Sequence, residues 1–152
     1  MRAGILPRLK ESERWLVFRL RPGSKPFDTL AQHLLRGPSK QSSQQSGDIL
    51  LDEPSVDDGD VMTLTEELFR EPGRLGLELR AQAEQHDAKV LLFIDQLEEL
   101  VTLADESQRN QFMLALCRAA DEPLDPVRIV VTVRDDFVGR LAINSSVREV
   151  LA

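Results

Sequence analysis

The sequence feature that most constrains the fold is an unbroken apolar run at residues 90–94, Val-Leu-Leu-Phe-Ile, which ends at Asp95. A strand with one solvated face alternates apolar and polar residues, so a run without alternation indicates a strand that is buried on both faces. A second strand-like stretch, the mostly apolar residues 128–133, ends at Arg134. Neither run is long enough to span a bilayer. The two runs predict strands of a parallel sheet that has helices on each side.

Strand and helix signals alternate along the rest of the chain, which predicts the α/β class. Residues 15–20 are rich in strand-forming side chains and are followed by Pro22 and Gly23, so we expect a third strand there. The spacing of Thr63 and Glu66 is that of a capping box, which marks a helix start. Apolar spacing, caps and prolines together predict helices at residues 27–35, 63–70, 72–85, 96–103, 105–120, 136–142 and 145–151, and the end of a helix at residues 2–9. The first of these helices would bury Phe27, Leu30, Ala31, Leu34 and Leu35.

The chain has 152 residues, 41% of them hydrophobic, which fits one domain with a real core. Residues 37–60 are polar and then acidic, and we expect them to form a disordered loop. The acids of this loop lack the order of a calcium-binding loop. The net charge of −7 leaves no basic excess for nucleic acid, so no nucleic-acid partner is expected.

The sequence shows neither a signal peptide nor a membrane segment. Cys117 is the only cysteine and cannot form an internal disulfide, which favours a reducing compartment. Because it lies in an apolar run, Cys117 is expected to be a small buried hydrophobe. We therefore expect a cytoplasmic protein without a membrane partner.

Charged residues follow two of the expected strands, at the sheet edge where open α/β proteins bind ligands. Asp95 could hold Mg²⁺, because this ion takes one or two carboxylates and keeps several waters. Glu98 or Glu99, one helical turn further on, could orient an attacking water. Arg134 could contact a terminal phosphate. In the alternative interpretation Asp95 caps the next helix, Glu98 and Glu99 form its solvated face, and Arg134 pairs with Asp135.

The stretch at residues 91–100, Leu-Leu-Phe-Ile-Asp-Gln-Leu-Glu-Glu-Leu, is more specific than a strand that ends in Asp. It resembles the Walker B signature of the STAND NTPases, in the branch called novel STAND NTPase 1, whose members typically read D-Q-F-E-E-L. Leu97 replaces the usual Phe. Residues 2–9 resemble the helix after the family's P-loop, and residues 21–31 resemble the segment after its second strand. Residues 131–137 resemble its sensor strand, with Asp135 at a position that is commonly small.

The resemblance implies a partial P-loop NTPase-like, three-layer α/β fold that spans residues 1–152. The family's sheet order is fifth, first, fourth, third, second, and the three expected strands match the second, third and fourth. The first strand and the P-loop would be absent, since the sequence contains no G-x-x-x-x-G-K-[ST] motif. The glycine-containing segments at Gly23 and Gly37 lack the Gly-Lys pair.

On this resemblance the intact family binds ATP and Mg²⁺ for signal transduction, whereas the present chain alone is expected to bind neither and to be inactive. Its partners would be the remainder of its own NTPase and fused sensor or repeat domains. The exposed edge of the 128–133 strand would also invite self-association. Two other functions stay open, a non-enzymatic α/β interaction module and an unrelated magnesium hydrolase that uses Asp95, Glu98 and Glu99.

Overall fold

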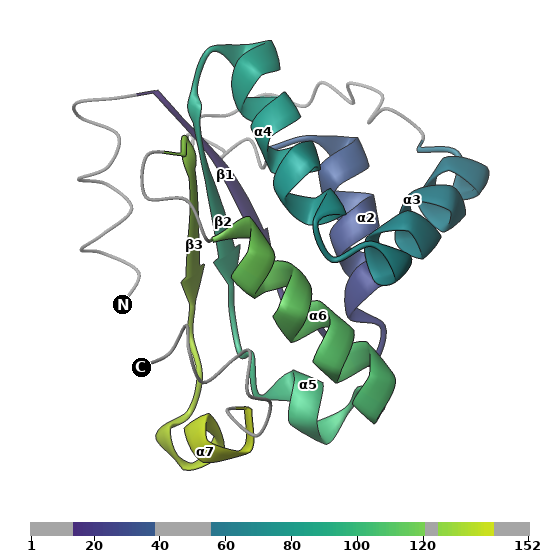
Figure 1. Cartoon of the computed structure of the whole chain (residues 1–152), viewed down its shortest axis with the longest axis vertical. Helices are drawn as coiled ribbons and strands as arrows, with labels where there is room; N and C mark the ends of the chain where they lie inside the picture. Colours follow the sequence, from purple (N-terminus) through teal and green to yellow (C-terminus); the bar gives the residue numbers. More distant parts are fainter. Residues whose placement is uncertain (1–13, 39–55, 121–124, 142–152) are drawn as a thin grey trace, which may run out of the picture.

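The computed structural model describes residues 14–38, 56–120 and 125–141, which form one sheet with a layer of helices against it (Figure 1). The sheet has the order β1-β2-β3, and both strand pairs are parallel. In chain order the elements are β1 (Trp15–Leu20), α2 (Pro26–Arg36), α3 (Asp58–Arg70), α4 (Arg74–His86), β2 (Lys89–Ile94), α5 (Glu99–Thr102), α6 (Glu106–Ala119), β3 (Val127–Val131), the 3₁₀ turn η1 (Asp135–Phe137) and α7 (Val138–Leu141). The α/β class and the parallel sheet are confirmed, and the strand that contains residues 90–94 lies at the centre of the sheet.

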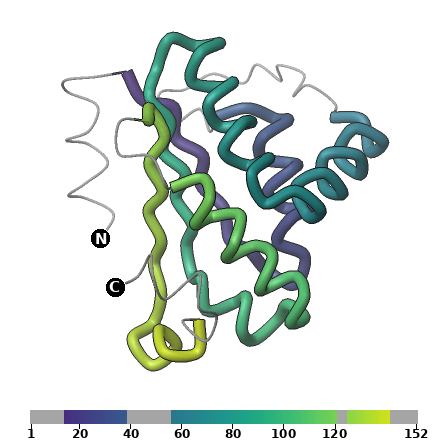
Figure 2. Tube along the Cα trace, in the orientation of Figure 1, coloured from purple at the N-terminus to yellow at the C-terminus, as the bar shows by residue number. Residues whose placement is uncertain are grey.

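One face of the sheet carries the core. In the parallel register Leu20, Ile94 and Val131 lie side by side, as do Phe18, Leu92 and Ile129. These side chains belong to, or pack against, the main apolar cluster, into which α2, α4 and α6 also project. The Cα trace shows the three helices on that side of the sheet (Figure 2). Burial of this shared face is what fixes the strand register, because a slip by one residue would turn the apolar side chains to the other face.

The opposite face of the sheet is less uniformly apolar. Leu91 is buried there, whereas the Arg19 guanidinium lies over the Phe93 ring at 5.4 Å from its centroid. The helices expected at residues 2–9 and 145–151 lie outside the described residues. The prediction of helices on both faces of the sheet therefore stays a prediction.

Aromatic packing joins the helices to one another. The Phe27 ring of α2 meets the Phe69 ring of α3 and the Phe112 ring of α6 edge to face, with centroids 5.5 and 5.4 Å apart. Such pairs add to the free energy of burial because the ring edge and the ring face carry opposite partial charges. The buried side chains of α2 are those expected, except that Leu35 is 39% exposed.

Helix α3 begins earlier than the sequence predicted. Asp57 caps it by accepting a hydrogen bond from the Gly59 amide, and the Thr63 hydroxyl donates to the Gly59 carbonyl within the helix. Thr63 is therefore not the cap, because Asp57 supplies a carboxylate acceptor six residues before it. Asp58 and Asp60 are helical rather than part of a loop. Residues 39–55 of the predicted loop lie outside the described residues.

Two elements near the sheet edge are shorter than predicted. Gln96 has a φ of 60°, which interrupts helical geometry after Asp95, so α5 begins only at Glu99. Strand β3 ends at Val131 instead of residue 133.

Helix α4 begins at Arg74, two residues after Pro72. Within the described ranges, no helix is long and apolar enough to cross a membrane.

Candidate functional site

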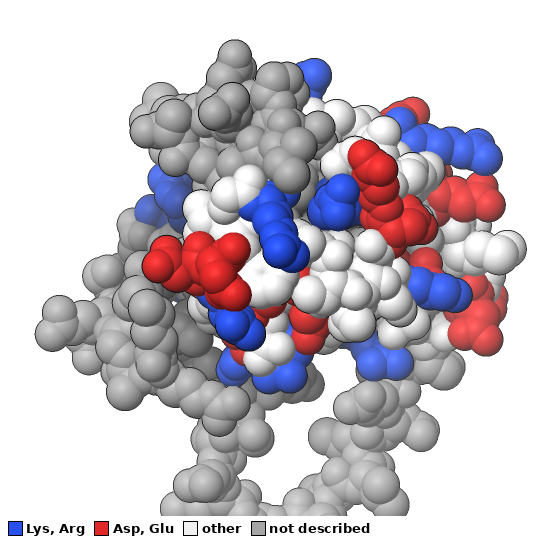
Figure 3. Space-filling view, turned by 90° about the horizontal axis from the view of Figure 1, so that it is seen from below, with Lys and Arg blue, Asp and Glu red and all other residues white. Residues whose placement is uncertain are grey.

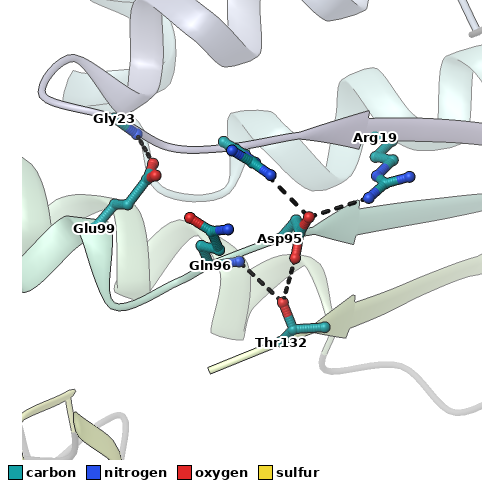
Figure 4. Close-up of polar contacts among 7 residues, drawn as sticks. Arg19, Gly23, Asp95, Gln96, Glu99 and Thr132 are labelled. Atoms are coloured by element: carbon teal, nitrogen blue, oxygen red, sulfur yellow. Dashed lines mark hydrogen bonds and ion pairs between the residues drawn. The ribbon is translucent and has the colours of Figure 1, made fainter. Parts of the chain in front are cut away.

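The carboxyl edge of the sheet places Asp95 between its two neighbouring strands (Figure 4). The parallel ladder continues one step past β2, because the Asp95 amide donates to the Leu20 carbonyl and the Thr132 amide donates to the Ile94 carbonyl. Asp95 is therefore held by backbone hydrogen bonds on a rigid strand tip. Its side chain is 19% exposed, so it is accessible at this edge.

Each oxygen of the Asp95 carboxylate has its own partners. Thr132 Oγ1 lies 2.7 Å from Oδ1 and donates to it. On the other side, Arg19 Nη2 lies 3.1 Å and Arg21 Nε 3.7 Å from Oδ2. The Thr132 hydrogen bond lowers the pKa of Asp95 below its usual range, and the Arg19 hydrogen bond and the charges of both arginines act in the same direction against the opposing effect of burial. Asp95 is consequently an anion at neutral pH.

Thr132 also fixes the turn that follows Asp95. Its hydroxyl oxygen accepts from the Gln96 amide at 2.9 Å, and its backbone carbonyl accepts from the Leu97 amide at 2.8 Å. Since the one hydroxyl hydrogen is donated to Asp95, the Gln96 amide meets a lone pair. These contacts hold Gln96 at its left-handed backbone angle.

Glu98 and Glu99 lie at the same edge but do not contact Asp95. Glu99 Oε2 accepts from the Gly23 amide at 3.0 Å, in the loop after β1, where Gly23 has a φ of 63°. Glu98 Oε2 accepts from the Arg134 amide at 3.4 Å, in the segment after β3. Both side chains are half-buried. They are therefore not purely solvated, because each accepts a hydrogen bond from the backbone of a neighbouring loop.

Arg134 lies at the expected edge, but its guanidinium is engaged elsewhere. Nε and Nη2 bind the two carboxylate oxygens of Asp136 at 3.1 and 3.0 Å, and the group lies over the Phe137 ring. The alternative pairing with Asp135 is therefore wrong, since Asp136 takes both donors in the forked geometry that Arg favours. The residues next to Asp95 are Arg19, Arg21 and Thr132, which the sequence reasoning did not assign to the site.

Asp95 does not cap a helix either. The residue before α5 is Glu98, and its side chain makes no cap hydrogen bond. The Asp95 oxygens are taken by Thr132 and the two arginines, so its contacts lie across the sheet edge rather than along the chain. The helix-cap interpretation is corrected accordingly.

The described residues at this edge offer few protein ligands for a metal ion. Among the residues that the structure describes, no three His, Cys, Asp or Glu side chains converge as metal ligands. Asp95 contributes one ionised carboxylate, whose oxygens already contact Thr132 and the two arginines. Mg²⁺ accepts such a sparse set because waters and substrate phosphates complete its octahedron. The surface seen from below, at the end toward which the strands run, carries both acidic and basic side chains, and neither sign of charge dominates it (Figure 3).

The model of the family described as Novel STAND NTPase 1 matches residues 1–152, the whole chain. No curated protein and no solved structure matches the chain.

Proposed function

Since the chain belongs to the novel STAND NTPase 1 family, we propose that it is part of an ATP-dependent signal-transduction NTPase whose carboxyl sheet edge forms the Mg²⁺ side of a nucleotide site. One observation carries the proposal. Asp95 is an anion, and it lies at the end of the central strand, which has a parallel strand on each side. Open parallel sheets bind ligands at this edge.

In this proposal Asp95 is the metal ligand, and the other charged residues act on the phosphate and the attacking water. Asp95 would hold Mg²⁺ directly or through water, with Thr132 keeping its carboxylate in place. Bound Mg²⁺ would neutralise charge on the phosphate oxygens. Arg134 would contact the terminal phosphate after leaving Asp136, a pair that is exposed and therefore weak. Glu98 or Glu99 would orient the attacking water through the carboxylate oxygen Oε1, since the backbone amide occupies Oε2.

By itself the 152-residue chain should bind ATP weakly. The sequence has no G-x-x-x-x-G-K-[ST] motif, so it lacks the backbone amides and the Lys that surround the phosphates in P-loop proteins. One charge-assisted hydrogen bond contributes about 1.5–3 kcal/mol. A dissociation constant of about 1 mM already requires about 4 kcal/mol. We therefore expect affinity for ATP no tighter than about millimolar.

Calorimetric titration of the chain with ATP and Mg²⁺ tests this expectation. No saturable heat should develop in the micromolar range. A micromolar isotherm would show that the missing motif is not what limits binding.

The partners proposed for this chain are the rest of an NTPase domain, fused sensor or repeat domains, and a second copy. Within the described residues β3 pairs only with β2, so its other edge presents unpaired backbone groups, and Ile129 and Val131 on its core-facing side are only partly buried. An apolar strand edge of this kind favours pairing with a further chain segment.

A non-enzymatic interaction module remains the second candidate, and one observation favours it. Glu98 and Glu99 both accept hydrogen bonds from backbone amides of adjoining loops, which is a structural role that needs no nucleotide. In that case neither Mg²⁺ nor ATP would perturb the carboxyl edge.

A further inference from the structure

Gln96 has a backbone conformation that is unusual for its residue type. Its φ is 60°, in the left-handed region that glycine occupies freely and that strains a residue with a Cβ atom. Two other described positions with positive φ are glycines, Gly23 and Gly37. A third, Asp87, ends helix α4 in the left-handed conformation that is common at helix C-termini. Gln96 is neither a glycine nor a helix end, so its residue type needs another explanation.

Hydrogen bonds of the main chain hold Gln96 in this conformation. Its amide donates to Thr132 Oγ1 at 2.9 Å, and its carbonyl accepts from the Glu99 amide at 3.0 Å. The next amide, that of Leu97, donates to the Thr132 carbonyl at 2.8 Å. None of these contacts uses the Gln96 side chain, and a glycine would make all of them with less strain. The turn therefore does not account for a glutamine at this position.

The Gln96 carboxamide lies at the carboxyl edge of the sheet, directly after Asp95. Figure 4 shows it directed away from Thr132, on the Glu99 side of the turn. The residue is half-buried, and within the described part of the chain its carboxamide makes no hydrogen bond. A carboxamide offers two N–H donors, and phosphate oxygens are strong acceptors for such donors. Backbone strain that the fold does not require is typical of residues that contact a ligand.

We propose that Gln96 is a ligand-contacting residue, whose side-chain Nε2–H donates to a phosphate oxygen of a nucleotide at this edge. This inference rests on the proposed nucleotide site. The main chain directs the carboxamide before the ligand arrives, so the contact needs no rearrangement of the turn. It also leaves the contacts of Asp95 with Thr132 and Arg19 intact. The phosphates arrive with Mg²⁺, which offsets their repulsion by the Asp95 carboxylate.

A glycine at this position separates the ligand contact from the fold. Gln96→Gly should relieve the strain and raise the folding equilibrium constant about twofold to fivefold, as measured by urea denaturation. The same variant should bind Mg²⁺–ATP about threefold to tenfold more weakly, because one hydrogen bond to phosphate is lost. The initial slope of the Thr132 amide shift against ATP concentration measures this loss. A side chain that served only the fold would give lower stability on removal and an unchanged slope.

Asp87→Gly is the matched control. Asp87 also has a positive φ, of 45°, but it lies before the other end of β2, at the amino edge of the sheet. This substitution should raise the folding equilibrium constant in the same way and leave the slope with Mg²⁺–ATP unchanged.

The side-chain amide resonances of Gln96 provide a second readout that needs no variant. Mg²⁺–ATP and Mg²⁺–tripolyphosphate should each move the ¹⁵Nε2 resonance of Gln96, whereas adenosine should not, because the contact is to phosphate. The Gln85 carboxamide is the internal control, since Gln85 is exposed near the end of α4 and should not respond.

The outcomes separate this inference from the function on which it rests. If Mg²⁺–ATP moves the Thr132 and Arg134 amides but neither moves Gln96 Nε2 nor binds more weakly to Gln96→Gly, the contact is wrong and the nucleotide site stands. If Mg²⁺–ATP moves none of these resonances, the site fails and the contact fails with it. A response of Gln96 Nε2 to adenosine alone, or a less stable Gln96→Gly variant, would also overturn the contact.

Discussion

The Thr132 hydroxyl donates to Asp95 Oδ1 across 2.7 Å and thereby joins the tips of β2 and β3. The same hydroxyl accepts from the Gln96 amide, so one side chain orients the carboxylate and closes the turn behind it. This arrangement keeps a charged group on a rigid strand end, where it can act on a ligand without reorganisation of the backbone.

Replacing Thr132 by Val should destabilise the chain by about 1–3 kcal/mol, because the isosteric side chain leaves the Gln96 amide and one Asp95 oxygen without their partner. Urea denaturation gives the free energy of unfolding. Thr102→Val is the control, since the Thr102 hydroxyl donates only to a carbonyl of its own helix, and it should change stability by less than about 0.5 kcal/mol. Equal effects of the two substitutions would show that the Thr132 hydrogen bonds contribute no more to the free energy of unfolding than the single hydrogen bond of Thr102.

Asp95→Asn should remove part of the acid sensitivity of folding. The pKa of Asp95 is lowered in the folded state, first by the Thr132 hydrogen bond and then by the arginines, so ionised Asp95 stabilises the fold above its unfolded pKa of about 3.9. This contribution is lost as the pH falls through the lowered folded value. The difference in unfolding free energy between wild type and Asp95→Asn should therefore be constant above about pH 5 and shrink below about pH 4. A difference that does not depend on pH would contradict the assignment.

Arg80→Met should be the most damaging of the arginine substitutions. Asp125 is buried at the entrance to β3, with its side chain 4% exposed, and Arg80 of α4 is its charged partner. Loss of the guanidinium removes the Arg80 salt bridge from a buried carboxylate, which should cost about 2–3 kcal/mol, less than a fully buried pair because Arg80 is itself partly exposed. Arg70→Met, which breaks only an exposed pair with Glu66, should cost less than about 1 kcal/mol in the same thermal or urea experiment. A result in the opposite order would refute the structural role of the Arg80–Asp125 pair.

The sequence predicted the sheet better than the site. Apolar runs and strand-forming residues identified all three described strands, and an acid directly after the central run identified Asp95, because both signals are local in the chain. The neighbours of Asp95 are not local. Arg19 is 76 residues away and Thr132 is 37 residues away, and only the strand order and the register bring them together. With that register assumed, Thr132 follows the partner of Ile94 and could have been placed beside Asp95.

The sequence also could not show which of two nearby candidate residues makes a given contact. Asp135 and Asp136 are both close to Arg134 in the chain, and the 3₁₀ turn that starts at Asp135 decides which carboxylate meets the guanidinium. Likewise Asp57 and Thr63 each precede a plausible helix start. The helix starts at the earlier one, where the Asp57 carboxylate accepts a hydrogen bond from the Gly59 amide.

The most direct test of the account is a titration of the ¹⁵N-labelled 152-residue chain with ATP and Mg²⁺, followed by its amide resonances. We expect progressive, fast-exchange shifts at Gln96, Thr132 and Arg134, which surround Asp95 and the loop that carries Arg134, with no saturation below about 1 mM. The shifts should vanish in Asp95→Asn, whereas Arg70→Met should keep them. Saturation at micromolar ATP, or shifts that leave the carboxyl edge of the sheet untouched, would contradict a weak Mg²⁺–nucleotide site at Asp95.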